Sequence, residues 1–315
     1  MMILHQNVKT GATFDIATLT EGAKWTTKRS GSPASLELTV LKDSLIQWDE
    51  GDKISVTTAD ANIFYGFVVK ISETEEEVKV TAYDQVWYLK KNIETYVFKN
   101  KRADQILTQI AQDFGLTLGA LENTAYMIPS MIEDGQTLLD IILKALDHTL
   151  INTAKMFYLW DDFGKLTLSD AEKSRLEVVI GDGSLATGYT YEREIDSETS
   201  NKIKLAKDNK ETGKRDIHVL FDNETMAQWG TLQLYEKVNE SLTEAQIKAK
   251  AENMLAWYNR PRKSFSLKAL ANLKVRGGTA VYVTVGDIEM QSWFIVEEAT
   301  HDLLNEEMDL KLKVV

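Results

Sequence analysis

The spacing of the apolar residues changes twice along this chain of 315 residues. Up to about residue 93, apolar and polar side chains alternate, which is typical of half-buried strands. The spacing then becomes three and four residues, as on one face of a helix, and returns to two near the C-terminus. The sequence therefore predicts an α+β fold that is mainly β, with two β-barrel-like domains bracketing a small α/β domain.

Residues 1–93 are predicted to form an N-terminal β-barrel, because short alternating runs separated by turn residues are typical of closed antiparallel sheets. The predicted strands are 13–19, 35–40, 53–57, 64–71 and 78–83. The predicted turns lie at Gly11, Gly22, 31–33, 50–52 and 59–62.

Residues 94–170 are predicted to form the α/β unit. One helix is expected over 103–114, where the apolar residues share one face and Gly115 follows as a natural end. A second is expected over 138–149, because Thr137 and Asp140 form a capping pattern. The strand patterns at 156–160 and 165–168 predict a hairpin.

Residues 171–315 are predicted to form a second β-barrel-type domain. The predicted strands are 176–180, 188–191, 201–206, 216–221, 230–235, 264–270, 279–285, 292–299 and 308–314. One helix interrupts them at about 243–258, between a capping box at 241–244 and Pro261.

Composition restricts the chemistry of the chain. The chain has 36 Lys and Arg against 48 Asp and Glu, and its net charge of −12 opposes sequence-independent binding to nucleic-acid phosphates. We expect no sequence-specific nucleic-acid binding either. The chain has no Cys, and its four His residues are scattered at 5, 148, 218 and 301. We therefore expect no metal site and no cofactor.

The hydropathy pattern gives no sign of a membrane span. The N-terminus has four apolar residues and no basic leader, so it does not resemble a signal peptide. No apolar run approaches the roughly 18 residues that a membrane helix requires. The expected compartment is therefore a reducing cytoplasm.

Catalytic motifs such as GxSxG, HExxH or a phosphate-binding loop are missing from the sequence. Asp161 and Asp162 are a candidate carboxylate pair for glycoside hydrolysis. Neighbouring residues at a strand end point to opposite sides, however, which favours a simple turn. We therefore expect no enzymatic activity, and a peptidoglycan hydrolase is the minor alternative.

The turn before the second helix resembles the start of a LysM module, in which a Gly-Asp-Thr-Leu turn opens a helix. LysM modules bind the N-acetylglucosamine backbone of cell-wall glycans. Gly135, Gln136 and Thr137 are therefore candidate glycan-binding residues, although Gln136 replaces the Asp. The alternative, which we favour, is that the same small LysM-like fold is a spacer.

Several short motifs occur in a fixed order along nearly the whole chain. They are EGD at 50–52, FYGF at 64–67, TAYD at 81–84, YLK at 88–90, ADQIL at 103–107, FGL at 114–116, QTLLDII at 136–142, GKL at 164–166, NKI at 201–203, GTLQ at 230–233 and RGG at 276–278. Together they resemble the baseplate hub proteins of contractile-tailed phages and prophages of Gram-positive bacteria, of the XkdQ/YqbQ type. Those proteins are related in architecture to the phage tail protein D and the T-even hub.

The resemblance implies a structural protein without enzymatic activity. Three copies would form a ring in which two β-barrels per chain adapt a six-fold tail tube to a three-fold spike. The implied partners are further copies of the chain, the tail tube protein, the spike or puncturing protein and other baseplate proteins. The implied location is the host bacterial cytoplasm during assembly, and then the tail of the virion or tail-like particle.

A ring around a passage must let its cargo slide, and a basic wall would bind DNA phosphates and hold the cargo in place. We therefore expect acidic residues to line the channel. The candidates are Asp49, Glu50, Asp52, Glu73, Glu75, Glu76 and Glu77. The alternative is that these carboxylates keep the outer surface soluble.

Overall fold

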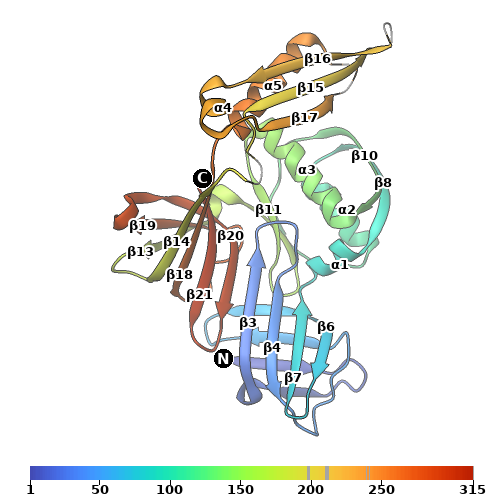
Figure 1. The fold of residues 1–315 in the computed structure, drawn as a ribbon. Coiled ribbons are helices and arrows are strands. Elements are labelled where there is room, and N and C mark those ends of the chain that lie inside the picture. Colours follow the sequence, from blue (N-terminus) through green and yellow to red (C-terminus); the bar gives the residue numbers. More distant parts are fainter. Residues whose placement is uncertain (197–198, 210–212, 239, 241, 315) are drawn as a thin grey trace. The chain divides into compact units, whose positions relative to one another are not determined.

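The computed structural model describes residues 1–196, 199–209, 213–238, 240 and 242–314. The chain divides into two compact units (Figure 1). Unit 1 comprises residues 1–190 and 265–315, and unit 2 comprises residues 191–264.

The main feature of unit 1 is a curled sheet of 13 strands, so the prediction of a mainly β chain is confirmed. Its N-terminal half is antiparallel throughout and buries one face around Trp25, Leu36 and Val80. The strands of this half, in sheet order, are β3 (Thr20–Lys28), β4 (Ser35–Leu41), β7 (Glu77–Tyr83), β6 (Asn62–Glu73), β5 (Lys53–Thr57), β1 (Met2–Gln6) and β2 (Thr13–Asp15).

The C-terminal half of the same sheet is built around one long strand, β20 (Met290–Asp302). The other strands of this half are β21 (Glu307–Val314), β18 (Arg262–Leu270), β14 (Ala186–Glu194), β19 (Ala280–Val285) and β13 (Arg175–Gly181). β20 pairs with β19 and β21, and its C-terminal end pairs with β3. The two β-rich regions of the sequence therefore belong to one continuous sheet.

The α/β part of unit 1 lies between these halves in the sequence. Its elements are α1 (Val86–Lys91), β8 (Ile93–Lys101), α2 (Ala103–Asp113), β9 (Leu118–Leu121), β10 (Ile128–Thr137), α3 (Leu138–Thr153), β11 (Phe157–Asp161) and β12 (Leu166–Asp170). β8 and β10 form an antiparallel ribbon, and the predicted hairpin is β11–β12. The apolar faces of α2 and α3 supply much of the buried core of this part.

Helix α3 is one turn longer than the apolar pattern predicts. The hydroxyls of Thr149 and Thr153 donate to the carbonyl oxygens of Ala145 and Thr149, so they satisfy polar groups in the last turns. The helix ends at Thr153, and the next residue, Ala154, has a left-handed φ of 56°.

The sequence pattern does not predict strand β3, because Gly22 is also typical of a turn. In the structure Gly22 lies within β3 at a register irregularity opposite β4, where a residue without a side chain fits a bulge. Ala23, Trp25 and Thr27 then alternate toward the core and are at most 3% exposed. The turn prediction at Gly22 is therefore wrong.

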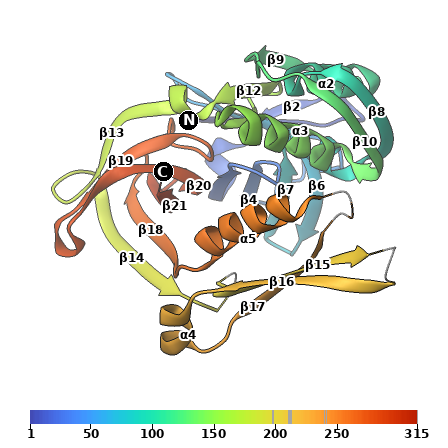
Figure 2. The same cartoon turned by 90° about the horizontal axis from the view of Figure 1, so that it is seen from above.

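Unit 2 is a small α/β unit with its own core. Its elements are β15 (Lys202–Asn209), β16 (Lys214–Phe221), α4 (Asn223–Trp229), β17 (Gln233–Val238) and α5 (Glu244–Tyr258). The strands form a separate sheet with β15 in the centre, antiparallel to β16 and parallel to β17. Helix α5 lies along one face of this sheet (Figure 2) and contributes Ile247 and Ala251 to its core.

Unit 2 divides the region that the sequence assigns to a second β domain at 171–315, and α5 occupies the range predicted for the inserted helix. The predicted boundaries near 93 and 170 stay predictions. Short 3-10 helices complete the fold at Ala17–Leu19, Ala171–Ser174 and Gly286–Ile288. Among the described residues, none of the helices combines the length and the hydropathy needed to cross a membrane.

Candidate functional site

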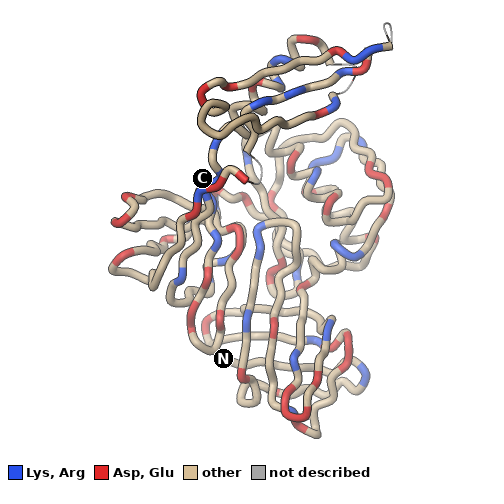
Figure 3. Tube along the Cα trace, viewed as in Figure 1, with Lys and Arg blue, Asp and Glu red and all other residues tan. Residues whose placement is uncertain are grey.

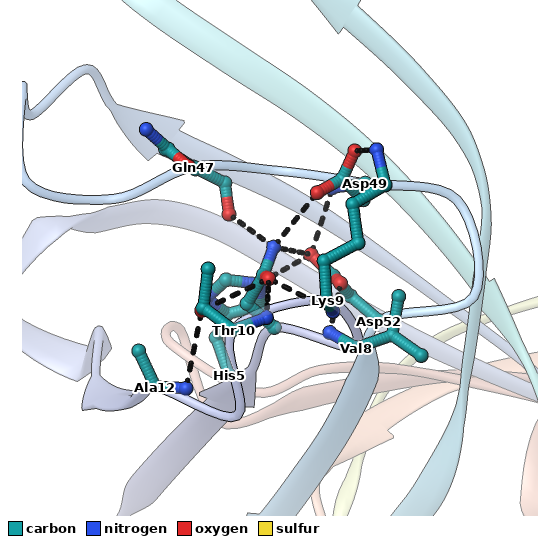
Figure 4. Close-up of polar contacts among 9 residues, drawn as sticks. His5, Val8, Lys9, Thr10, Ala12, Gln47, Asp49 and Asp52 are labelled. Carbon is teal, nitrogen blue, oxygen red and sulfur yellow. Dashed lines mark hydrogen bonds and ion pairs between the residues drawn. The ribbon is translucent and has the colours of Figure 1, made fainter.

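Asp52, the last residue of the EGD motif and a candidate channel residue, belongs to a buried polar network (Figure 4). Asp52 is fully buried, and its Oδ2 lies 2.7 Å from Nε2 of His5, which is also fully buried. Its two carboxylate oxygens also accept the backbone N–H groups of Val8 at 2.7 Å and Asp49 at 2.8 Å. Because this carboxylate is enclosed by donors, Asp52 cannot line a channel, and that expectation is wrong for this residue.

Asn7 extends the network toward the surface. Its Nδ2 donates to the carbonyl oxygen of Gln47 and to Oδ2 of Asp49, at 3.1 and 3.0 Å. Asp49 also forms an ion pair with Lys9, whereas Glu50 is exposed. The network therefore fastens the turn after β1 to the loop before β5.

Replacing Asp52 by Asn is expected to lower the free energy of unfolding by about 2 kcal/mol, because the new amide N–H₂ would face buried donors. Chemical denaturation of the full chain measures this change. Glu50→Gln is the matched control, because it makes the same change at an exposed neighbour and is expected to shift stability by less than about 0.5 kcal/mol. Equal effects of the two substitutions would show that the network does not stabilise the fold.

The other acidic candidates lie at the connection between β6 and β7, where Figure 3 shows a concentration of Asp and Glu. Glu73 pairs with Lys42 at 2.8 Å, and Glu77 lies 3.7 Å from Lys79. Glu75 and Glu76 are exposed. These residues are available at the surface, and their place in a channel stays a prediction.

In the turn that resembles the start of a LysM module, the polar side chains form hydrogen bonds within the chain. Gly135 has a φ of 59° beside a bulge in β10. The hydroxyl of Thr137 accepts the backbone N–H of Asp140 at 3.1 Å and caps α3, while Gln136 Nε2 donates to the carbonyl oxygen of Asp134. This geometry explains the turn as a helix start, and glycan binding stays a prediction.

The candidate carboxylate pair is divided between the interior and the surface. Asp161 is 7% exposed, and its Oδ1 accepts the N–H of Gly164 in the turn after β11. Asp162 is exposed. The two carboxyl groups do not converge on a common space, which agrees with the interpretation of this segment as a turn.

Arg276 lies at a junction between the N-terminal half of the sheet, the α/β part and the C-terminal half. Its guanidinium carbon is 3.8 Å from the ring centre of Trp160, and its Nη2 donates to the carbonyl oxygen of Asp161 at 3.3 Å. The same guanidinium is 5.9 Å from the ring centre of Trp25 in β3. One side chain therefore contacts elements that are more than 100 residues apart in the sequence.

Two buried carboxyl groups, those of Asp84 and Asp161, interact electrostatically with Arg276 at this junction. Burial raises the pKa of Asp84 well above its ordinary value, and the nearby Asp161 raises it further. Burial also raises the pKa of Asp161, whereas the positive charge of Arg276 lowers both. Asp84 accepts the backbone N–H groups of Ala34 and Val86, both at 3.0 Å, and so holds the end of β7 in place.

The two glycines of the RGG motif allow the backbone to approach its neighbours. A Cβ on Gly277 would lie 2.4 Å from the backbone carbonyl carbon of Lys28. A Cβ on Gly278, which has a φ of 96°, would lie 2.3 Å from the ring of Tyr158. The N–H of Gly277 donates to the hydroxyl of Thr27 at 2.9 Å. No side chain larger than hydrogen fits at either position without a shift.

Gln85 completes the junction with its side-chain amide. Its Nε2 donates to the carbonyl oxygens of Thr117 and Gly164, at 3.1 and 3.0 Å. Gly164 in turn packs against Tyr65 of the FYGF motif. Residues from the motifs at 64–67, 81–84, 164–166 and 276–278 thus lie together, and no feature of the sequence indicates that these separate motifs meet.

The four histidines do not form a common site. His5 belongs to the Asp52 network, and His301 stacks on Trp25 with ring centres 5.1 Å apart. Burial lowers the pKa of His301. His148 lies on α3 and His218 on β16. Among the residues that the structure describes, no three His, Asp or Glu side chains gather as metal ligands.

Comparison with known proteins gives consistent matches over most of the chain. The model of the YQBQ-like family matches residues 23–315. The phage-like element PBSX protein XkdQ of Bacillus subtilis (strain 168) is 30% identical over 294 residues, which cover 91% of this chain and 89% of that protein.

Solved structures share the fold at low sequence identity. The 43 kDa tail protein of prophage MuSo2 from Shewanella oneidensis has a TM-score of 0.71 at 14% identity, covering 100% of this chain and 98% of that one. An E. coli type VI secretion component, itself described as similar to the T4 tail proteins gp27 and gp5, has a TM-score of 0.56 at 8% identity. That match covers 94% of this chain and 74% of that one.

Proposed function

Because the chain belongs to the YQBQ-like family, we propose that it is a structural protein of the baseplate of a phage tail or phage-tail-like particle. The relative XkdQ is a protein of a phage-like element, and the fold is shared with a prophage tail protein. The shared fold of the type VI secretion component supports a role in a contractile injection system. The role that we propose is structural and needs no catalytic site.

The junction around Arg276 is the observation that carries this proposal. A closed ring requires that the two contact surfaces of each subunit keep a fixed angle, because small errors accumulate around the ring. In unit 1 the continuous strand β20 and the junction hold the two halves of the sheet and the α/β part together. These contacts between distant parts of unit 1 support its role as a ring subunit.

More specifically, we propose that the chain is the tail hub. Three copies would place six sheet halves around the ring axis, which would match the six-fold tail tube on one side and the three-fold spike on the other. The outer face of the β8–β10 ribbon supports assembly, because Ile93, Val97 and Ile132 are 62%, 58% and 68% exposed. Val97 and Ile132 are direct neighbours across the ribbon, and such apolar patches are typical of protein interfaces.

The proposed partners are further copies of the chain, the tail tube, the spike and other baseplate proteins. The protein would assemble in the host cytoplasm and then reside in the tail. We also propose that exposed carboxylates, with Glu50, Glu75 and Glu76 as candidates, line the passage of the ring. Their exposure and the net charge of −12 support this arrangement.

Imaging of purified tail particles tests the hub assignment. We expect a copy number that is a multiple of three, with interfaces between copies above about 1,000 Å². The same reconstruction locates Glu50, Glu75 and Glu76, and a neutral or basic lumen would remove the channel proposal alone. Absence of the chain from the particles, or a copy number that is no multiple of three, would contradict the hub role.

A further inference from the structure

One face of the sheet in unit 2 carries exposed apolar side chains at alternate positions. Ile217, Val219 and Phe221 of β16 are 46%, 44% and 48% exposed. Leu220 points the other way, into the core that α5 covers. Because β16 is also an edge strand, such a row is an association site unless another surface covers it. We call this surface the outer face of unit 2.

Two lysines stand beside this apolar row. Lys202 lies directly opposite Phe221 in the sheet, and Lys204 lies opposite Val219. Within the described part of the chain, neither lysine has an ion-pair partner, and both are only partly exposed. The outer face therefore combines apolar area with positive charge that the described residues of unit 2 do not neutralise.

Two further cations on this face are already neutralised, because Arg215 and Lys237 both pair with Asp208. Tyr235, in the neighbouring strand β17, is 48% exposed and adds an aromatic ring opposite Lys204. Tyrosine is among the residue types enriched at protein interfaces. The composition of the outer face thus fits a protein partner with acidic groups.

The charge of the chain is distributed unevenly between its units. Residues 191–264 contain 13 Lys or Arg and 13 Asp or Glu, so the net charge of −12 falls entirely on unit 1. Copies of unit 1 repel each other at long range, whereas a neutral unit with a basic face does not oppose the approach of an acidic surface. The negative charge that complements the basic outer face is thus present on unit 1 of the same chain.

We propose that the outer face of unit 2 docks on the acidic surface of unit 1 in a second copy of the chain. The contact is heterologous, since different surfaces of the two copies meet, and contacts of that kind close into rings. The apolar row supplies the buried area, and Lys202 and Lys204 select an acidic partner surface. This inference rests on the proposed assembly function and names one of its interfaces.

Photo-cross-linking of the full-length protein tests the docking directly. With benzoylphenylalanine at position 219, we expect covalent dimers whose cross-linked peptides come from acidic segments of residues 1–190 or 265–315. Absence of dimers, or cross-links confined to unit 2, would overturn the proposal. Cross-links to a different protein in assembled particles would assign the face to that partner instead.

Sedimentation of purified variants provides a second measurement. Lys204→Glu is expected to weaken self-association about tenfold and to reduce its sensitivity to salt, because it places a negative charge against an acidic surface. Lys248→Glu, which makes the same charge change at an exposed position on α5, is the matched control and should have little effect. Equal effects of the two substitutions would contradict docking through the outer face.

A wrong interface and a wrong hub role would give different experimental results. If Lys204→Glu protein enters tails normally and in multiples of three, the hub role stands and the proposed interface is wrong. If the wild-type protein associates as described but is absent from tails, the hub role fails while the interface remains.

Discussion

Replacing Arg276 by methionine is expected to lower the free energy of unfolding of unit 1 by about 4 kcal/mol. The substitution keeps part of the packing against Trp160 but removes the positive charge beside Asp84 and Asp161. Removing one partner from a buried charge cluster leaves the other charges uncompensated, and this strongly destabilises the folded state. Denaturation followed by tryptophan fluorescence measures the effect, because Trp25 and Trp160 adjoin the guanidinium.

The loss should depend on pH in a defined direction. Both aspartates have folded-state pKa values above their ordinary values, so the ionisation of each one costs stability as the pH rises through its folded pKa. Without Arg276 these pKa values rise further, and the cost of ionisation grows. The difference in stability between wild type and Arg276→Met is therefore expected to be smallest near pH 4 and to increase toward neutral pH.

Arg215→Met is the control for Arg276→Met, since Arg215 is exposed and its ion pair with Asp208 lies at the surface. It is expected to change stability little. A loss for Arg276→Met that is constant with pH would show that the guanidinium acts by packing alone. A loss no larger than that of Arg215→Met would remove the junction as a stabilising element.

Replacing Gly278 by alanine is expected to cost about 3–5 kcal/mol. Its φ of 96° is strained for any residue with a side chain, and the new methyl group would overlap the ring of Tyr158. The clash would push the segment after Arg276 away from β11, so the variant should also fail to enter tail particles if unit 1 must be rigid. Thermal or chemical unfolding measures the stability, and particle composition measures the incorporation.

Gly183→Ala separates the two causes of that loss. Gly183 also has a positive φ, 70°, but a Cβ there would meet nothing within 4 Å. We expect it to cost only about 1–2 kcal/mol, which is the strain of the left-handed backbone. Equal losses for the two variants would show that the close packing of Gly278 on Tyr158 contributes nothing.

The elements with strong periodicity could be predicted from the sequence. The spacing of apolar residues in α2 and α3, and the capping pattern before α5, gave the type and approximate position of these helices. Strand β3 was missed because Gly22 is as compatible with a bulge as with a turn. Unit 2 was missed as a separate body, because the parallel pairing of β15 with β17 depends on a crossover that alternation alone does not reveal.

The functional residues were harder to predict, for a different physical reason. Asp84, Asp161 and Arg276 are distant in the sequence, and only the folded sheet brings them together. The EGD turn motif does not reveal that Asp52 is buried, so the sequence places this residue on an acidic surface. One of its hydrogen-bond partners, Asp49, is close in the sequence, whereas the other two are in β1 and in the turn that follows it. By contrast, the order of the short motifs indicated the family, which the family match confirms.

Unit 2 is inserted between β14 and β18, and these two strands are neighbours in the main sheet. The chain thus leaves the main sheet after β14 and re-enters it at the neighbouring strand β18. Lengthening a connection costs little in closure entropy, about 0.6 kcal/mol for each doubling. The strand order of the main sheet therefore does not depend on the length of the segment that is inserted at this connection.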